Sequence, residues 1–254
     1  MTDATAASVN EMQTSARPLA GRALAPWAFG AAMLVSAALV FSLQPMFAKM
    51  VLPRVGGGAA VWTVALVFFQ GALLAGYCYA HLISARLKFT HQVAVHGAVL
   101  AGAAMFLPIA VAGGFEAPPN DGQGFWLLAL FAASVGAPFA AISATAPLLQ
   151  AWFARTGRAD AGDPYYLYGA SNAGSLAALL AFPVLIEPQL GAHAQSLAWS
   201  AGFALLAVSI LGCAALVFVL GGARMAPAAA HAARASTWGE RLKWATLGLL
   251  PSLL

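Results

Sequence analysis

Charge is what this sequence has least of. Asp, Glu, Lys and Arg together make up 8% of its 254 residues, against roughly 25% in a typical soluble domain. Hydrophobic residues make up 61% of the chain, so too few polar side chains remain to cover a soluble core of this size. The composition therefore excludes an ordinary soluble fold and indicates an integral membrane protein.

Other absences narrow the possible functions. The two cysteines, Cys78 and Cys213, lie in separate apolar runs and lack the spacing of a metal site or a redox motif. The sequence shows no hydrolytic triad, no paired carboxylates and no glycine-rich cofactor loop after a strand, which argues against a catalytic site in this chain. The Lys and Arg residues form no basic patch with interleaved aromatics, so nucleic acid is not an expected partner. We expect neither a metal nor a cofactor.

Long apolar runs are what the sequence has in abundance. A helix needs about 20 apolar residues to cross the hydrocarbon core of a bilayer. Six runs qualify, at residues 27–48, 60–84, 92–112, 124–152, 165–187 and 195–220, and a seventh opens at 242. We predict an all-α membrane fold with six transmembrane helices in residues 27–220 and the start of a seventh in residues 242–254. Residues 1–26 are expected to form a disordered tail and residues 221–241 a loop, and we expect the natural chain to continue past Leu254.

The basic residues predict an orientation for this bundle. Those that gather in the tail and in alternate connections are Arg17, Arg22, Arg86, Lys88, Arg155, Arg158, Arg224, Arg234, Arg241 and Lys243. Because connections rich in Lys and Arg normally stay in the cytoplasm, the N-terminus is predicted to be cytoplasmic. Lys49 and Arg54 are the exception, since they occupy the first outward connection.

The stretch "SLQPMFAKMVLPRVGGGAAVW", residues 42–62, contains this exception. Its three glycines are followed by an apolar helix and not by Lys-Ser/Thr, so they do not make a phosphate loop. Two interpretations of Lys49 stay open. It can extend to lipid headgroups at the outer interface, or Pro45 can kink the helix and direct Lys49 and Gln44 into a functional cavity.

Polar residues within the other runs complete a candidate pathway. Gln70 lies beside the small-residue stripe Ala72, Gly76 and Ala80, and is predicted to hydrogen-bond across a close helix contact. Pro138 and Pro147 predict a bent or broken helix in the fourth run. The candidate path residues are Gln44, Lys49, Arg54, Gln70, Ser171, Asn172, Ser175 and Glu187.

The fifth run is the most patterned part of the chain. Asp163 and Pro164 form a predicted helix start. Two stripes of small residues follow, Gly169, Ala173 and Ala177 beside Ala170, Gly174 and Ala178. Close helix packing and a polar pathway both fit this pattern. Glu187 abuts apolar residues on both sides, which makes it the best candidate for a proton or cation site.

Three stretches carry a resemblance to a known family. They are "LQPMFAKMVLPRVGG", "AVWTVALVFFQGALLAGYCYAHL" and "PYYLYGASNAGSLAALLAFPVLIEP". Together they resemble the N-terminal membrane region of bacterial spermidine synthase-like proteins, in which a major facilitator-like membrane part is fused to an aminopropyltransferase-like domain of methyltransferase fold. The resemblance covers roughly residues 27 to 254. Gln44 stands where many relatives carry an acid.

The resemblance implies a major facilitator-like half bundle in the bacterial inner membrane. It also implies a parent protein whose cytosolic domain binds decarboxylated S-adenosylmethionine or a related ligand. The expected role of this chain is then a non-catalytic membrane part that anchors or supplies that aminopropyltransferase-like domain, which lies outside the chain. Two alternatives stay open: a small-molecule transporter of the major facilitator type, and a membrane subunit that binds another membrane protein. The expected partners are the lipid bilayer, the cytosolic domain and a small-molecule substrate.

Overall fold

Helices are the regular elements of this protein. The computed structural model describes residues 3–158, 161, 165–221 and 237–249, and these residues contain no strand. The α-helices are α1 (Asp3–Val55), α2 (Ala59–Arg86), α3 (Phe89–Ala104), α4 (Gln123–Phe131), α5 (Ala137–Ser143), α6 (Thr145–Phe153), α7 (Tyr165–Ala181), α8 (Glu187–Gln189), α9 (Ala192–Val219) and α10 (Trp238–Leu249). Two π-helical segments, η1 (Ala132–Gly136) and η3 (Phe182–Ile186), and one 3-10 turn, η2 (Ala154–Thr156), continue some of them.

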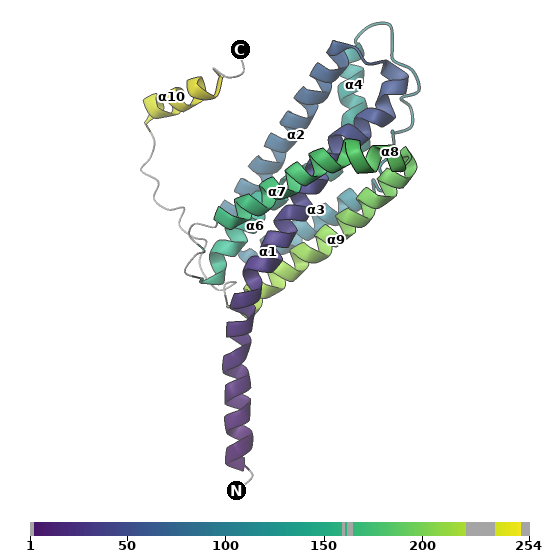
Figure 1. Cartoon of the computed structure of the whole chain (residues 1–254). Coiled ribbons are helices and arrows are strands. Elements are labelled where there is room, and N and C mark those ends of the chain that lie inside the picture. Colours follow the sequence, from purple (N-terminus) through teal and green to yellow (C-terminus); the bar gives the residue numbers. More distant parts are fainter. Residues whose placement is uncertain (1–2, 159–160, 162–164, 222–236, 250–254) are drawn as a thin grey trace.

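Five helical segments are long and apolar enough to cross a membrane. They are Gly21–Val55, Ala59–Arg86, Gln123–Thr156, Tyr165–Gln189 and Ala192–Val219. Each matches one of the six predicted runs, and the helices pack into one bundle (Figure 1). The predicted all-α class is confirmed, and the apolar helices are those of a membrane protein.

The third predicted span is wrong beyond Ala104. Helix α3 has 16 residues and is about 24 Å long, shorter than a hydrocarbon core of about 30 Å. After it the chain continues without a helix, and two hydrogen bonds hold this backbone. Ser196 Oγ donates to the carbonyl oxygen of Ile109 at 2.6 Å, and the Ala112 N–H donates to Ser134 Oγ at 3.0 Å. Irregular backbone at membrane depth is tolerated where the protein itself satisfies its polar groups.

Both ends of the chain differ from their predicted boundaries. Helix α1 begins at Asp3 and includes residues 3–26, which were expected to form a disordered tail; alanine, common in this segment, is the strongest helix former. Helix α10 begins at Trp238, before the predicted start at 242. A capping box sets this start, since the Thr237 N–H donates to Glu240 Oε2 and the Glu240 N–H donates to Thr237 Oγ1. The predicted cap at Asp163 and Pro164, most of the 221–241 loop and residues 250–254 lie outside the described residues.

Helices α1 and α7 run parallel and in close contact (Figure 1). Gly30 of α1 lies opposite Ala170 of α7, and Leu34 lies opposite Gly174. Residue numbers therefore increase in the same direction along both helices. A Cβ added to Gly174 would lie 2.2 Å from the Leu34 carbonyl oxygen, so the backbones touch here. One predicted stripe, that of Ala170, therefore makes a close helix contact. The other stripe, which starts at Gly169, is exposed.

Two further sequence predictions concern the contact of α2 with the fourth run. A Cβ on Gly76 would lie 2.9 Å from the Ala140 carbonyl oxygen, which confirms the close approach predicted for the stripe of α2. The fourth run passes through η1 and is interrupted at Ala144 between α5 and α6, which confirms the predicted bent or broken helix. Pro138 and Pro147 cannot donate backbone hydrogen bonds, which accounts for an irregular ladder there.

Basic residues from distant segments meet at one end of the bundle. The Arg158 guanidinium donates to the carbonyl oxygen of Arg22. The guanidinium carbon of Arg155 lies 5.8 Å from the ring centroid of Phe89, a cation–π contact that joins η2 to the start of α3. Lys49 lies 27 residues after Arg22 along α1, which corresponds to about 40 Å of helix. Lys49 therefore belongs to the opposite end.

The Gly174 contact predicts a selective loss of stability. Gly174→Ala should lower the free energy of unfolding by about 1–3 kcal/mol, because the new methyl group meets backbone that cannot move aside. Gly169→Ala is the matched control: nothing lies within 4 Å of its Cβ position, and alanine favours the helix by up to about 1 kcal/mol. Thermal unfolding of the detergent-solubilised protein measures both variants. Equal stability of the two would contradict the packing described here.

Candidate functional site

A polar cavity lies between α1, α2, α5, α6 and α7. Its volume is about 240 Å³, and it is lined by Ser36, Ala37, Val40, Phe41, Gln44, Phe69, Gln70, Leu73, Tyr77, Phe139, Ile142, Ser143, Ala146 and Ser171. Six of these residues carry a polar side-chain group, and the rest are apolar or aromatic. Such a mixture, with mostly apolar walls and a few polar groups, is typical of a small-molecule site.

Helical periodicity explains how the polar groups converge. Gln70 and Tyr77 are seven residues apart on α2, so they lie two turns apart on one face. Ser36 and Gln44 are eight residues apart on α1 and share a face in the same way. Ser171 comes from α7, which its contact with α1 at Gly174 holds in place. The structure thus brings together three of the predicted path residues, Gln44, Gln70 and Ser171.

The polar groups of the cavity fall into two classes. Ser36 Oγ donates to the Ile142 carbonyl oxygen at 3.4 Å, and Ser143 Oγ donates to the Phe139 carbonyl oxygen at 2.7 Å. These two hydroxyls therefore already donate hydrogen bonds to backbone carbonyl oxygens of the protein. The side chains of Gln44, Gln70, Tyr77 and Ser171 have no hydrogen-bond partner within the described part of the chain. The predicted cross-helix hydrogen bond of Gln70 is therefore absent there, and four polar groups are free to bind a ligand.

The cavity carries no charge among the described residues that line it. Side-chain amides, a hydroxyl and a phenol offer both donors and acceptors of hydrogen bonds. Burial of an ion would be costly in such a site, because no opposite charge compensates for its lost hydration. The arrangement therefore favours an uncharged molecule over a cation or an anion.

Lys49 makes an ion pair instead of lining this cavity. Its Nζ atom lies 3.3 Å from Oε1 of Glu187, and the two side chains are 35% and 47% exposed. Two predicted path residues that are far apart in the sequence are thus partners, and the pair joins the end of α1 to the segment after η3. Arg54 lies on the last turn of α1, where its Nη1 donates to the Met50 carbonyl oxygen at 3.0 Å. The ion pair is a contact that neither interpretation of Lys49 included, and both interpretations stay predictions.

Asn172 and Ser175 lie outside the cavity. Asn172 is exposed, and Ser175 Oγ donates to its backbone carbonyl oxygen at 2.9 Å. Such a local bond is common for a serine in a helix. Neither residue is among those that line the cavity, although both are close to Ser171 along α7.

Half of the polar residues that line the cavity were not among the predicted path residues. These are Ser36, Tyr77 and Ser143, and the spacing of Tyr77 from Gln70 is the signal that could have found one of them. A separate buried group was also missed. His96 is 1% exposed, its ring centroid lies 6.1 Å from that of Tyr79, and in the described chain neither its ring nitrogens nor the Tyr79 hydroxyl has a hydrogen-bond partner. The described residues contain no group of three or more His, Cys, Asp or Glu side chains that could hold a metal.

The ion pair predicts a measurable coupling between Lys49 and Glu187. A double-mutant cycle with Lys49→Gln and Glu187→Gln should give an interaction energy of about 0.5–1 kcal/mol, because each single change leaves one charge without its partner. Thermal unfolding in detergent measures the four proteins. The exchanged pair Lys49→Glu with Glu187→Lys should regain most of the loss.

Arg54→Gln supplies the control for this cycle. Arg54 is the other basic residue near this end of α1, and the hydrogen bond given for it is to its own helix. Combined with Glu187→Gln, it should show no coupling. A coupling as large as that of Lys49 would mean that Glu187 interacts with the general positive charge of this end and not with one partner.

Comparisons with protein-family models, with curated proteins and with solved structures give no match for this chain. The features of the molecule that indicate a function are therefore the polar, uncharged cavity within the bundle and the ion pair at its end.

Proposed function

We propose that this chain is a non-catalytic membrane bundle that binds a small uncharged polar molecule, in the manner of one half of a major facilitator-type transporter. The observation that supports this best is the set of four polar side chains without partners in one cavity. Gln70 and Tyr77 are exposed and Gln44 and Ser171 are half-buried, so their amide and hydroxyl groups are accessible to a ligand that enters the bundle.

The chemistry of the cavity limits the ligand. Gln44 and Gln70 each offer an amide that both donates and accepts, and Tyr77 and Ser171 offer hydroxyls. The volume of about 240 Å³ is roughly that of eight waters at about 30 Å³ each. The ligand is thus a compact molecule with hydroxyl, amide or carbonyl groups.

A second role is favoured by the same lack of charge. A polyamine path would need carboxylates, and Gln44 occupies the position at which the resemblance leads us to expect an acid. If the chain is the membrane region of a spermidine synthase-like protein, polyamine would not pass through this cavity. The bundle would then anchor the cytosolic aminopropyltransferase-like domain of its parent, and the cavity would serve another ligand or none.

We also propose that the bundle lies in a bacterial inner membrane with its N-terminus in the cytoplasm. The support is the meeting of Arg22, Arg155 and Arg158 at one end, close to the α2–α3 connection. Basic residues gather at the cytoplasmic side of membrane proteins. The ion pair would then lie at the outer side, where Glu187 neutralises the charge of Lys49.

Cysteine modification tests the uncharged cavity. In a Cys78→Ser background, Ser171→Cys should react with an uncharged, water-soluble methanethiosulfonate reagent faster than with cationic or anionic reagents of the same size. The physical reason is the cost of bringing a charge into an uncharged site. Leu176→Cys is the control on the same helix, because Leu176 is 57% exposed on an apolar surface where thiolate is disfavoured, so it should react slowly with all three.

Two results would overturn the binding proposal. If Ser171→Cys reacts with none of the reagents, the cavity is closed to aqueous solutes. If the charged reagents react as fast as the uncharged one, the ligand need not be uncharged.

Labelling in intact cells tests the orientation. Gly57→Cys, in the α1–α2 connection, should react with a membrane-impermeant maleimide added outside. Thr90→Cys, at the start of α3, should react only after the cells are permeabilised. Gly57 has no atom within 4 Å of its Cβ position and Thr90 is exposed, so both changes should be tolerated. The reverse labelling pattern would place the N-terminus outside.

A further inference from the structure

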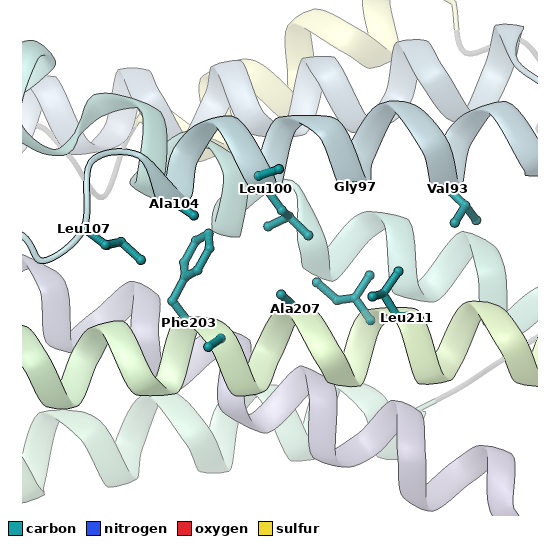
Figure 2. Close-up of a pocket in the computed structure, with 11 residues that line it drawn as sticks. Val93, Gly97, Leu100, Ala104, Leu107, Phe203, Ala207 and Leu211 are labelled. Atoms are coloured by element: carbon teal, nitrogen blue, oxygen red, sulfur yellow. The ribbon is translucent and has the colours of Figure 1, made fainter.

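An apolar groove lies between α3 and α9 (Figure 2). Its volume is about 350 Å³, and the residues that line it are Val93, Gly97, Leu100, Ala101, Ala104, Leu107, Phe203, Ala204, Ala207, Ile210 and Leu211. None of these side chains is polar, and five of the residues are glycine or alanine. The small residues leave space between two helices that would otherwise be filled by their own side chains.

Contacts close the groove at both of its ends. At the Val93 end, the rings of Phe89 and Phe218 pack with centroids 4.9 Å apart. At the Leu107 end, Ser196 donates its hydroxyl to the carbonyl oxygen of Ile109. Between these contacts the groove opens sideways, since Leu211 on its wall is 56% exposed. Helix α9 is the most apolar of the candidate membrane spans, with a mean hydropathy of 2.6, so the opening faces the hydrocarbon of the bilayer.

The size and chemistry of the groove decide what can fill it. Two turns of an α-helix, about 10 Å in diameter, occupy roughly 850 Å³, more than twice the volume of the groove. Water is excluded because the lining offers it no hydrogen-bond partners. A hydrocarbon chain is narrow and apolar, and the surrounding bilayer supplies it.

The positive charge at one end selects the kind of lipid. Lys88 precedes the first residue of α3, is exposed, and has no ion-pair partner among the described residues. The first turn of α3 contains no acid and has no side-chain cap, so its free N–H groups add partial positive charge. Lys88 lies five residues before Val93, about 7.5 Å along the axis, which is close enough for a headgroup there to lead a chain into the groove.

We propose that this groove binds one acyl chain of an anionic phospholipid whose phosphate lies beside Lys88. The chain follows the small residues of α3 and α9, and the headgroup contacts Lys88 and the start of α3. This site is separate from the polar cavity, and it requires neither a ligand in the cavity nor a particular side of the membrane for the N-terminus.

Photo-cross-linking of the full chain in nanodiscs tests the proposal. The probes are phosphatidylglycerol and phosphatidylcholine with identical acyl chains that carry a diazirine, and mass spectrometry locates the cross-links. We expect cross-links on residues 93–107 and 203–211, with phosphatidylglycerol giving about five times the yield of phosphatidylcholine, as one Lys near a headgroup would provide. Lys88→Gln should bring the two yields together while the phosphatidylcholine yield stays unchanged.

Variants that fill the groove separate binding from general lipid contact. Ala207→Leu and Gly97→Leu should each lower the cross-link yield roughly tenfold, because the new side chain takes the place of buried methylenes. Ala201→Leu and Ala98→Leu are the controls on the same two helices, since both positions are exposed and outside the groove. Size-exclusion profiles show whether each variant folds, and the use of two filling variants keeps the test open if one fails.

Three outcomes would overturn the proposal. The first is an equal yield in the filling and control variants, which would mean contact with bulk lipid only. The second is cross-linking of these residues to another protein segment in place of lipid, which would make the groove a site for a second copy or for another part of the chain. The third is an unchanged preference for phosphatidylglycerol in Lys88→Gln, which would show that Lys88 does not bind the headgroup.

Discussion

The contact between Gly174 and the Leu34 carbonyl oxygen is the constraint on which the rest of the structure depends. It brings the backbones of α1 and α7 together where any side chain on Gly174 would collide. From this point, the parallel course of the two helices has two consequences. Ser171 lies on the wall of the polar cavity, and Glu187 arrives within 3.3 Å of Lys49. In a bilayer, where lipid and protein interior are equally apolar, such close backbone packing replaces the hydrophobic effect as the force that joins helices.

The same arrangement separates the Lys49–Glu187 ion pair from the polar cavity. The pair of Lys49 and Glu187 lies at the end of α1, while Gln44, the nearest polar residue of the cavity, lies five residues earlier, about 7.5 Å along the axis. Because the two charges neutralise one another, they impose little net field on the cavity. The binding energy of an uncharged ligand would not depend on a net electrostatic field in the cavity. A pair at the rim is also compatible with movement, since an exposed ion pair contributes only about 0–1 kcal/mol and can open at small cost.

The sequence predicts the fold better than it predicts the site, for physical reasons. Hydropathy reports the length of each apolar run, so five of the six predicted spans correspond to long helices. It does not report where a helix ends inside an apolar run, and so the end of α3 at Ala104 could not be foreseen. The stripe with Gly174 and the stripe with Gly169 look equivalent in the sequence, and only the partner helix distinguishes them. The pairing of Lys49 with Glu187 is equally invisible, because 138 residues separate them and no local pattern links the two.

The early end of α3 also explains why a groove exists beside it. Beyond Ala104 the chain leaves the helix and crosses toward η1 and α9, where Ser134 and Ser196 form hydrogen bonds with its backbone. These hydrogen bonds and the packing of Phe89 on Phe218 hold the segment to α9 at two separated points. Between them the α3 wall of the groove consists of Val93, Gly97, Leu100, Ala101 and Ala104. Three of these five residues are glycine or alanine, so their side chains leave space between α3 and α9. Polar bonds at one end and aromatic packing at the other thus maintain an opening that helix packing alone would close. An apolar opening of this kind persists in a membrane because lipid can fill it, whereas in water it would collapse or expose its walls at a cost.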